Sequence, residues 1–334
     1  MNAYRARTLA ALLVTVALVL GTVSPALAAT ATTAAAAPMD FATANLTGKA
    51  AAKTERLLAQ WGFGYWGTDG KWSDEDTYEL TLFQRWAGLT PNGKVTKALR
   101  SKMAAAWATY GATKIPRTKL PLEGRYIGVN AGHQGKPNNG RERVSPEKGS
   151  ETRKKVSAGT TGIASRVPEY KINLKVALRL QTALQDKGAR VLMARTTHNV
   201  NISNASRART MNKAGVDLLL TLHCDGSSKR SKHGLHTLQP VKRGYQKGDV
   251  LKDSRTLAAL IQEEAIDATG AKDLGLDNRR DLCSLNWAKM PTCLVEMGFM
   301  TNKAEDKKLN TTAYQKKLVK GFVAGITRYF QEVQ

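Results

Sequence analysis

Two histidines and two glutamates stand where the chain pattern commonly gathers reactive groups. His133, His223 and Glu296 each follow an apolar, strand-like run, and Glu169 comes directly after a proline in the first turn of a helical pattern. Two imidazoles and one carboxylate can hold zinc with one position left open, and a further glutamate can carry protons. The set points to a hydrolase. Taken singly, each residue has an ordinary structural explanation, such as a satisfied core histidine or a glutamate favoured by the helix dipole.

The elements that must position these residues can be read from the apolar pattern of residues 125–334. Strand-like runs are expected at 126–130, 190–194, 216–222, 234–238 and 292–296. Helical patterns are expected at 169–186, 203–214, 251–268 and 312–330. This alternation predicts an α/β fold with a mostly parallel, twisted sheet flanked by helices. The polar stretch 134–167 has no periodicity, and we expect a long loop there that serves the site as a lid or groove wall.

The first 124 residues divide into four expected segments. Residues 1–28 have the charged start, short apolar core and Ala-Leu-Ala cleavage signal of a secretory signal peptide. A flexible Ala/Thr-rich leader is expected at 29–47, a small all-α three-helix domain at 48–108 and a linker at 109–124. The catalytic domain then covers 125–334. No other segment is long and apolar enough to predict a transmembrane span.

The charge of the chain favours an anionic partner outside the cell. Removing Arg5 and Arg7 with the signal peptide lowers the formal net charge from +24 to +22. A secreted protein of this charge meets the anions of a cell wall before it meets nucleic acid, and the sequence has no recognisable nucleic-acid module. We therefore expect a secreted, extracellular or wall-associated monomer that binds peptidoglycan and anionic wall polymers, with no specific nucleic-acid partner.

The chain has three cysteines, Cys224, Cys283 and Cys293. Cys283 and Cys293 lie equally far from Ala288, so a hairpin-like return at Ala288 would place them opposite each other, within reach of a disulfide. We predict that disulfide and expect Cys224 to remain a buried free thiol.

Several motifs of residues 125–334 occur together in one order. They are 127–135, 169–174, 188–191, Arg195-Thr196, Arg207, Asn212, 217–223 and 291–302 with Glu305. In this, the segment resembles the zinc-dependent N-acetylmuramoyl-L-alanine amidases, a family of cell-wall amidases. Two positions depart from the family pattern: Thr197-His198 stands where an acidic residue is usual, and Cys224-Asp225 stands where a small residue and Asn are usual. These departures concern the fit of the substrate.

The resemblance implies that His133, Glu169 and His223 bind one zinc ion and that Glu296 is the catalytic acid/base. The implied reaction is hydrolysis of the amide between N-acetylmuramic acid and the L-alanine of the stem peptide by zinc-activated water. Two other functions stay open, a zinc peptidase or carboxypeptidase acting on the stem peptide and a non-catalytic wall-binding protein. Glu296 argues against the last, because a binding fold needs no carboxylate at that point.

Three further residues are candidates for substrate contact. Arg195 and Arg207 could bind the carboxylates of the stem peptide, or could pair with nearby acids. His236 could face the same cleft and stabilise the oxyanion, or could be a core or surface residue.

The N-terminal segment 48–108 carries an unusual density of aromatic residues. Through Leu57-Leu58, 69–72, Phe83-Gln84 and 88–95 it resembles the peptidoglycan-binding module found on many wall hydrolases. A flat aromatic face suits a sugar ring, and we predict that Trp61, Tyr65 and Trp66 form a contact surface for sugars.

Overall fold

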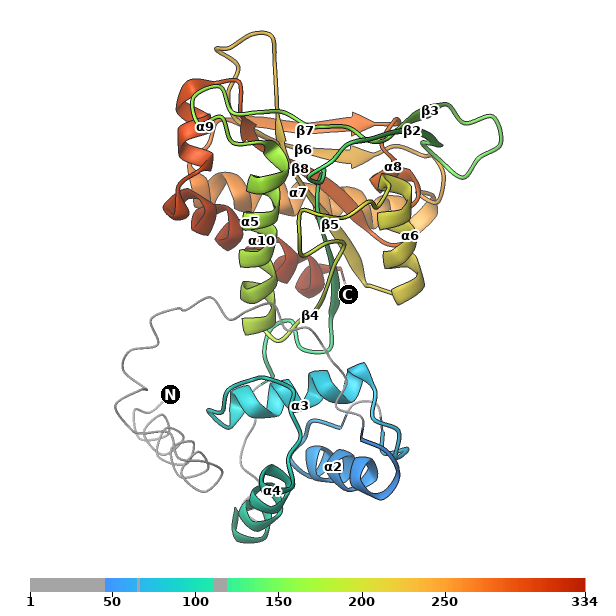
Figure 1. The fold of residues 1–334 in the computed structure, drawn as a ribbon, viewed down its shortest axis with the longest axis vertical. Helices are drawn as coiled ribbons and strands as arrows, with labels where there is room; N and C mark the ends of the chain where they lie inside the picture. Colours follow the sequence, from blue (N-terminus) through green and yellow to red (C-terminus); the bar gives the residue numbers. More distant parts are fainter. Residues whose placement is uncertain (1–45, 65–66, 111–118, 334) are drawn as a thin grey trace. The chain divides into compact units, whose positions relative to one another are not determined.

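The computed structural model describes residues 46–64, 67–110 and 119–333. The chain divides into two compact units, residues 1–119 and 120–334, whose elements are labelled in Figure 1. The expected signal peptide lies outside the described residues, as do Tyr65, Trp66, most of the expected leader and half of the expected linker. Among the residues described, none of the helices combines the length and the apolar character that crossing a bilayer requires.

The described part of the N-terminal unit is helical, with α2 (Gly48–Gln60), α3 (Asp74–Trp86) and α4 (Lys97–Tyr110). Helix α3 begins at a capping box, in which the Ser73 hydroxyl accepts a hydrogen bond from the backbone of Asp76 and the Asp76 carboxylate accepts one from the backbone of Ser73. These two reciprocal bonds satisfy donors that the first turn of a helix leaves unpaired.

Trp61 belongs to the core of this unit. Its side chain is only 5% exposed, and its ring centroid lies 5.3 Å from those of Trp86 and Trp107. The indole nitrogen donates to the carbonyl of Met103 at 3.3 Å. The prediction that Trp61 forms a sugar-contact surface is therefore wrong, because both its ring and its N–H are used inside the unit.

The C-terminal unit is built on a six-stranded sheet in the order β4-β1-β5-β8-β6-β7. The strands are β1 (Tyr126–Ala131), β4 (Arg190–Met193), β5 (Leu218–Asp225), β6 (Leu235–Pro240), β7 (Asp273–Arg279) and β8 (Thr292–Phe299). The first four in this order pair in parallel; β6 then pairs antiparallel with β8 and parallel with β7. The predicted α/β fold with a mostly parallel sheet is confirmed.

Helices cover both faces of the sheet because its inner strands are apolar on both sides. The helices are α5 (Glu169–Asp186), α6 (Asn204–Ala214), α7 (Gly248–Thr269), α8 (Cys283–Asn286), α9 (Lys303–Leu309) and α10 (Thr312–Glu332). In β5, Leu218 and Leu220 face the main core with α5, α7 and α10, whereas Leu219 faces a second cluster with Met211 of α6. Successive strand residues point to opposite faces of the sheet, so one apolar run contributes side chains to the core on each face.

The polar stretch 134–167, expected to be a loop, contains an antiparallel hairpin of β2 (Asn138–Arg143) and β3 (Thr152–Val156). Most residues of both strands are exposed or half-buried. Neither strand has an apolar face, and so the sequence carries no period-two signal.

The expected disulfide between Cys283 and Cys293 is not formed, and all three cysteines are free and buried. Cys283 begins the short helix α8 and packs with Val144 and Ala205, whereas Cys293 lies in β8 opposite Leu220 of β5. The chain between the two cysteines is a four-residue helix followed by an irregular segment rather than a hairpin return, so the expected pairing does not arise.

Candidate functional site

The edge of the sheet at the carboxyl ends of β1 and β5 brings the two predicted histidine ligands together. His133 follows β1 in a turn with a φ of 57°, and His223 lies near the end of β5. Their rings meet edge to face with centroids 4.6 Å apart. Parallel strands end at the same edge of a sheet, which is why residues 90 positions apart become neighbours.

Glu169, the first residue of α5, lies between these histidines. Its Oε2 is 3.1 Å from Nε2 of His133, and its Oε1 is 2.8 Å from Nδ1 of His223. Ligand atoms of the three residues all lie within 4.8 Å of one another. Burial opposes ionisation of Glu169, but hydrogen bonds from both histidines hold its pKa well below the ordinary glutamate value.

Neighbouring groups fix the orientation of the Glu169 carboxylate. It accepts hydrogen bonds from the backbone of Thr160 at 2.9 Å and of Cys224 at 3.1 Å, and from the side chain of Asn173 at 3.1 Å. On the far side of the site, Nδ1 of His133 lies 2.9 Å from the carbonyl of Ser157. That contact leaves Nε2 of His133 as the nitrogen directed at the site.

Two glycines let the backbone close around this group. A Cβ added at Gly132 would lie 2.1 Å from Nε2 of His223, and one added at Gly159 would lie 2.7 Å from Oε2 of Glu169. Either contact is shorter than any real carbon contact, so a side chain at these positions would displace the ligand groups. Sequence reasoning singled out neither glycine; the motif around residue 132 was the available signal.

Glu296 lies in β8 directly beside His223 in the strand register. Its Oε2 is buried and has no hydrogen-bond partner among the described residues. Burial, with the nearby charges of Glu169 and Asp225, raises the pKa of Glu296 well above the ordinary glutamate value. A carboxyl group in this state beside a group of metal-binding atoms is suited to accept and return a proton.

His236 lies beside Glu296, on strand β6, which pairs with the edge of β8 opposite to β5. It pairs with Glu296 in the antiparallel register of β6 and stacks on Phe299 with ring centroids 5.9 Å apart. Its Nε2 lies 3.3 Å from Oδ2 of Asp225. The structure therefore places His236 beside the predicted acid/base rather than in the hydrophobic core.

Arg195 is a structural residue of the site. It is 3% exposed, and its guanidinium donates to the carbonyls of Ala131, Gly132 and Tyr170 at 2.8–2.9 Å and of Thr197 at 3.1 Å. Burial lowers its pKa to about 10, so it keeps its charge at neutral pH. It is not free to bind a substrate carboxylate, which corrects that expectation.

Arg207 of α6 has the same kind of role. It is 1% exposed, and its nitrogens donate to the carbonyls of Ala131, His133 and Ile202 and to the side-chain oxygens of Asn130 and Gln134. Burial and the charge of Arg195 lower its pKa to about 9. Its donors are all engaged, so the expected role in binding the stem peptide is wrong for Arg207 as well. Both arginines instead shape the turn that carries His133.

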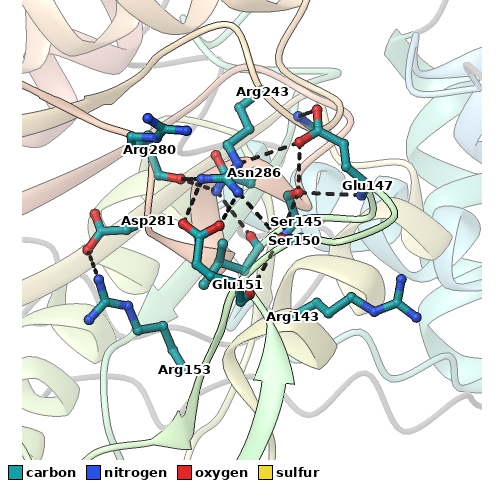
Figure 2. Close-up of polar contacts among 12 residues, drawn as sticks. Arg143, Ser145, Glu147, Ser150, Glu151, Arg153, Arg243, Arg280, Asp281 and Asn286 are labelled. Atoms are coloured by element: carbon teal, nitrogen blue, oxygen red, sulfur yellow. Dashed lines mark hydrogen bonds and ion pairs between the residues drawn. The ribbon is translucent and has the colours of Figure 1, made fainter.

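The β2–β3 hairpin is fastened to the body of the C-terminal unit, as Figure 2 shows. Arg243 makes a bidentate ion pair with Glu151 and also lies 3.5 Å from Glu147, whose Oε1 accepts from the backbone of Gly244. The Asn286 side chain donates to the carbonyl of Val144 at 3.1 Å. Of the two expected roles for this stretch, a fixed wall fits these contacts better than a lid.

The segment before Glu169 is held by Asp306 of α9. This fully buried carboxylate accepts from the backbones of Ala164 and Ser165, both at 2.7 Å, and from the Ser165 hydroxyl at 2.6 Å. The Asp306 carboxylate thus holds the loop that leads directly into α5 and its Glu169. Sequence reasoning missed Asp306 because nothing local marks an aspartate that binds a loop 141 residues away.

The donor set fits a bound metal ion. Two imidazoles and one carboxylate converge, His133 and Glu169 are held by hydrogen bonds from outside the group, and glycines keep side chains out of the space around them. Such a set, with a buried carboxyl group beside it, has the composition of the zinc sites found in hydrolases.

Comparison with known proteins places the chain in a family. The family model described as N-acetylmuramoyl-L-alanine amidase (Amidase_3) matches residues 127–328, more than half of the chain. The chain therefore belongs to this family of cell-wall amidases.

Individual relatives agree with the family assignment. The chain is 29% identical over 170 residues to N-acetylmuramoyl-L-alanine amidase CwlM of Mycobacterium tuberculosis, a match covering 51% of this chain and 40% of CwlM. It is 27% identical over 216 residues to N-acetylmuramoyl-L-alanine amidase Rv3717 of the same organism, covering 64% of this chain and 89% of Rv3717. The crystal structure of Ami1 from Mycobacterium smegmatis shares the fold, with a TM-score of 0.57 and 23% identity over 63% of this chain and 98% of that one.

Proposed function

We propose that the protein is a secreted, zinc-dependent N-acetylmuramoyl-L-alanine amidase that cleaves the amide between N-acetylmuramic acid and the L-alanine of the stem peptide. The observation that carries the proposal is the convergence of His133, Glu169 and His223 beside Glu296 at one sheet edge, in a chain of this amidase family.

The three ligand residues would hold zinc, which supplies a Lewis acid for the amide carbonyl and lowers the pKa of water. Glu296 takes a proton from the attacking water and gives it to the alanine nitrogen as the carbon–nitrogen bond breaks. Its buried, unpartnered Oε2 and raised pKa suit both transfers. His236, beside Glu296, would donate a hydrogen bond to the oxyanion that forms.

The remaining parts of the chain would bring this site to its substrate. Residues 1–28 would direct secretion, 29–47 would be a leader, 48–108 a wall-binding domain and 109–124 a linker to the catalytic domain at 125–334. The excess of positive charge would hold the protein on anionic wall polymers. Tyr65 and Trp66 are the aromatic residues of the N-terminal domain proposed to meet sugar rings.

The test is digestion of purified peptidoglycan by the full chain, with released amino groups and reducing sugar ends counted in the same sample. An amidase frees N-terminal alanine and no reducing ends. The activity should be lost with a chelator, return with zinc, and fall roughly 100-fold or more in Glu296→Gln, the scale expected for a general acid/base. New amino groups on residues other than alanine would instead identify a peptidase of the stem.

A matched variant guards against a loss of folding. Glu264→Gln removes a carboxylate that pairs with Arg328 at the surface, and it should leave the rate unchanged. Wall binding without any release by the wild-type protein would contradict the proposed enzyme and leave a binding protein.

A further inference from the structure

A row of aromatic and cationic side chains crosses the surface of the C-terminal unit beside the β2–β3 hairpin. The Arg209 guanidinium lies 5.2 Å from the centre of the Trp287 ring, Trp287 meets Tyr245 edge to face at 6.4 Å, and Nζ of Lys289 lies 4.9 Å from the Tyr245 ring. The order is therefore cation, aromatic, aromatic, cation. None of the four residues belongs to the candidate metal site.

Of the two aromatic members of this row, Tyr245 is exposed and Trp287 is half-buried, whereas most large apolar side chains among the described residues are buried. Tyr245 is 38% exposed, and among the described residues only Leu276, at 40%, is a comparably exposed large hydrophobic. An exposed tyrosine beside a half-buried tryptophan forms a continuous aromatic surface, and a continuous apolar surface of this kind is a feature of binding sites.

Hydrogen bonds to neighbouring segments fix the two aromatic residues of the row. The Trp287 indole N–H donates to the carbonyl of Arg143 at 2.9 Å, and its backbone carbonyl accepts from Asn212 at 2.8 Å. The backbone of Tyr245 donates to the carbonyl of Asn286 at 3.0 Å. Because the polar atom of the indole is satisfied, the ring itself is what the surface offers to a ligand.

A pocket of about 420 Å³ opens at the Trp287 end of the row. Its lining includes Arg143, Lys155 and Arg209, and the one acid that the described residues contribute to the lining is Glu142. Glu142 is already engaged, since its Oε1 accepts from the backbone of Ala205 at the start of α6. With three cations and one carboxylate among the described lining residues, the pocket has a net positive charge.

We propose that the row Arg209–Trp287–Tyr245–Lys289, with the pocket beside Trp287, binds an anionic saccharide. Sugar rings would lie against the aromatic side chains, whose flat apolar surfaces suit the axial C–H faces of a pyranose, and phosphate or carboxylate groups of the chain would meet the flanking cations. Helix α6 links this surface to the metal site, because Arg209 lies two residues from Arg207, which binds the carbonyl of His133 at 2.9 Å.

The test measures binding of the full chain to purified cell walls in a Glu296→Gln background, so that no substrate is consumed. Tyr245→Ala should weaken binding roughly fivefold, which is about 1 kcal/mol. The double variant Arg209→Ala/Lys289→Ala should weaken it by roughly tenfold and flatten its salt dependence. Leu276→Ala matches the first variant in exposure, and Lys316→Ala/Lys320→Ala on α10 matches the second in charge; both controls should stay within about twofold.

Two wall preparations identify the anionic group. A loss seen only on walls that retain phosphate-bearing polymers assigns the cations to phosphate, and an equal loss on walls stripped of those polymers assigns them to the carboxylates of peptidoglycan. Hydrogen exchange of the full chain, measured with and without soluble wall fragments, locates the bound surface. Residues 241–247 and 283–289 should exchange more slowly when the fragments are present. Unchanged exchange there, with the row variants binding no worse than the controls, would overturn the proposal. Because the readout is binding, it stands apart from any failure of the amidase activity.

Discussion

Replacing Arg207 with methionine should loosen the turn that carries His133. Arg207 is almost fully buried and its nitrogens donate five hydrogen bonds, three of them to backbone carbonyls. Methionine fills much of the same space and donates none of these bonds. The carbonyls of Ala131 and His133 would then have to find other donors inside the protein.

The size of the effect follows from these contacts. A hydrogen bond to a charged group contributes about 1.5–3 kcal/mol, so five independent bonds would sum to roughly 7–15 kcal/mol. They are not independent, since one side chain makes all of them and its removal also ends the penalty for burying a charge. We expect Arg207→Met to destabilise the C-terminal unit by about 3–5 kcal/mol, and Arg207→Lys, with three donors, by less.

The assay is denaturant unfolding of the full chain, with hydrogen exchange at residues 127–134 used to follow the C-terminal unit. The same substitution at Arg328, whose partners Glu263, Glu264 and Glu332 lie at the surface, is the control and should change stability little. Zinc affinity should fall in Arg207→Met because the turn no longer holds His133. Unfolding of Arg207→Met at the wild-type denaturant concentration, with zinc affinity intact, would refute this account of the turn.

Three further changes test other contacts. Asn173→Ala removes a donor to Glu169 and should weaken zinc binding roughly 10- to 100-fold in a competition titration, and unchanged affinity would show that Asn173 does not orient the ligand. Asp306→Ala removes three hydrogen bonds from the loop before α5 and should destabilise the unit by about 2–4 kcal/mol, with faster hydrogen exchange at residues 162–167. Hydrogen bonding to Arg243 lowers the pKa of Glu151 to about 2. The contact between Arg243 and the hairpin should therefore be intact at and above the pH at which a free glutamate titrates, and it should be lost as the pH falls toward 2. An NMR titration in which Glu151 protonates near the ordinary glutamate pKa would contradict the contact.

The inner strands and long helices could be predicted because apolar spacing decides them. Residues 218–222 form a run that is apolar except for Thr221 and that fits a strand covered on both faces, and Leu318, Phe322 and Ile326 recur at helical spacing on α10. The two histidines of the metal group could be proposed for a related reason, since parallel strands bring the residues at their carboxyl ends to one edge of the sheet.

The parts that escaped prediction are fixed by contacts distant in sequence. Arg195 and Arg207 look like substrate-binding cations in a linear sequence, because nothing local shows that backbone carbonyls await them inside the fold. Trp61 resembles a sugar-binding residue until Trp86 and Trp107 are seen around it. The β2–β3 hairpin is held by Arg243, about 90 residues away, and its own residues are polar on both faces.

The turn around His133 is shaped by two guanidinium groups rather than by the ion that its histidine would bind. Arg195 and Arg207 together bind the carbonyls of Ala131, Gly132 and His133. These bonds are made within the chain, so the polypeptide itself fixes the backbone on which His133 stands. For the zinc enzyme that we propose, the ion could then leave and return without refolding of the turn, and metal supply would act as a reversible control of its activity.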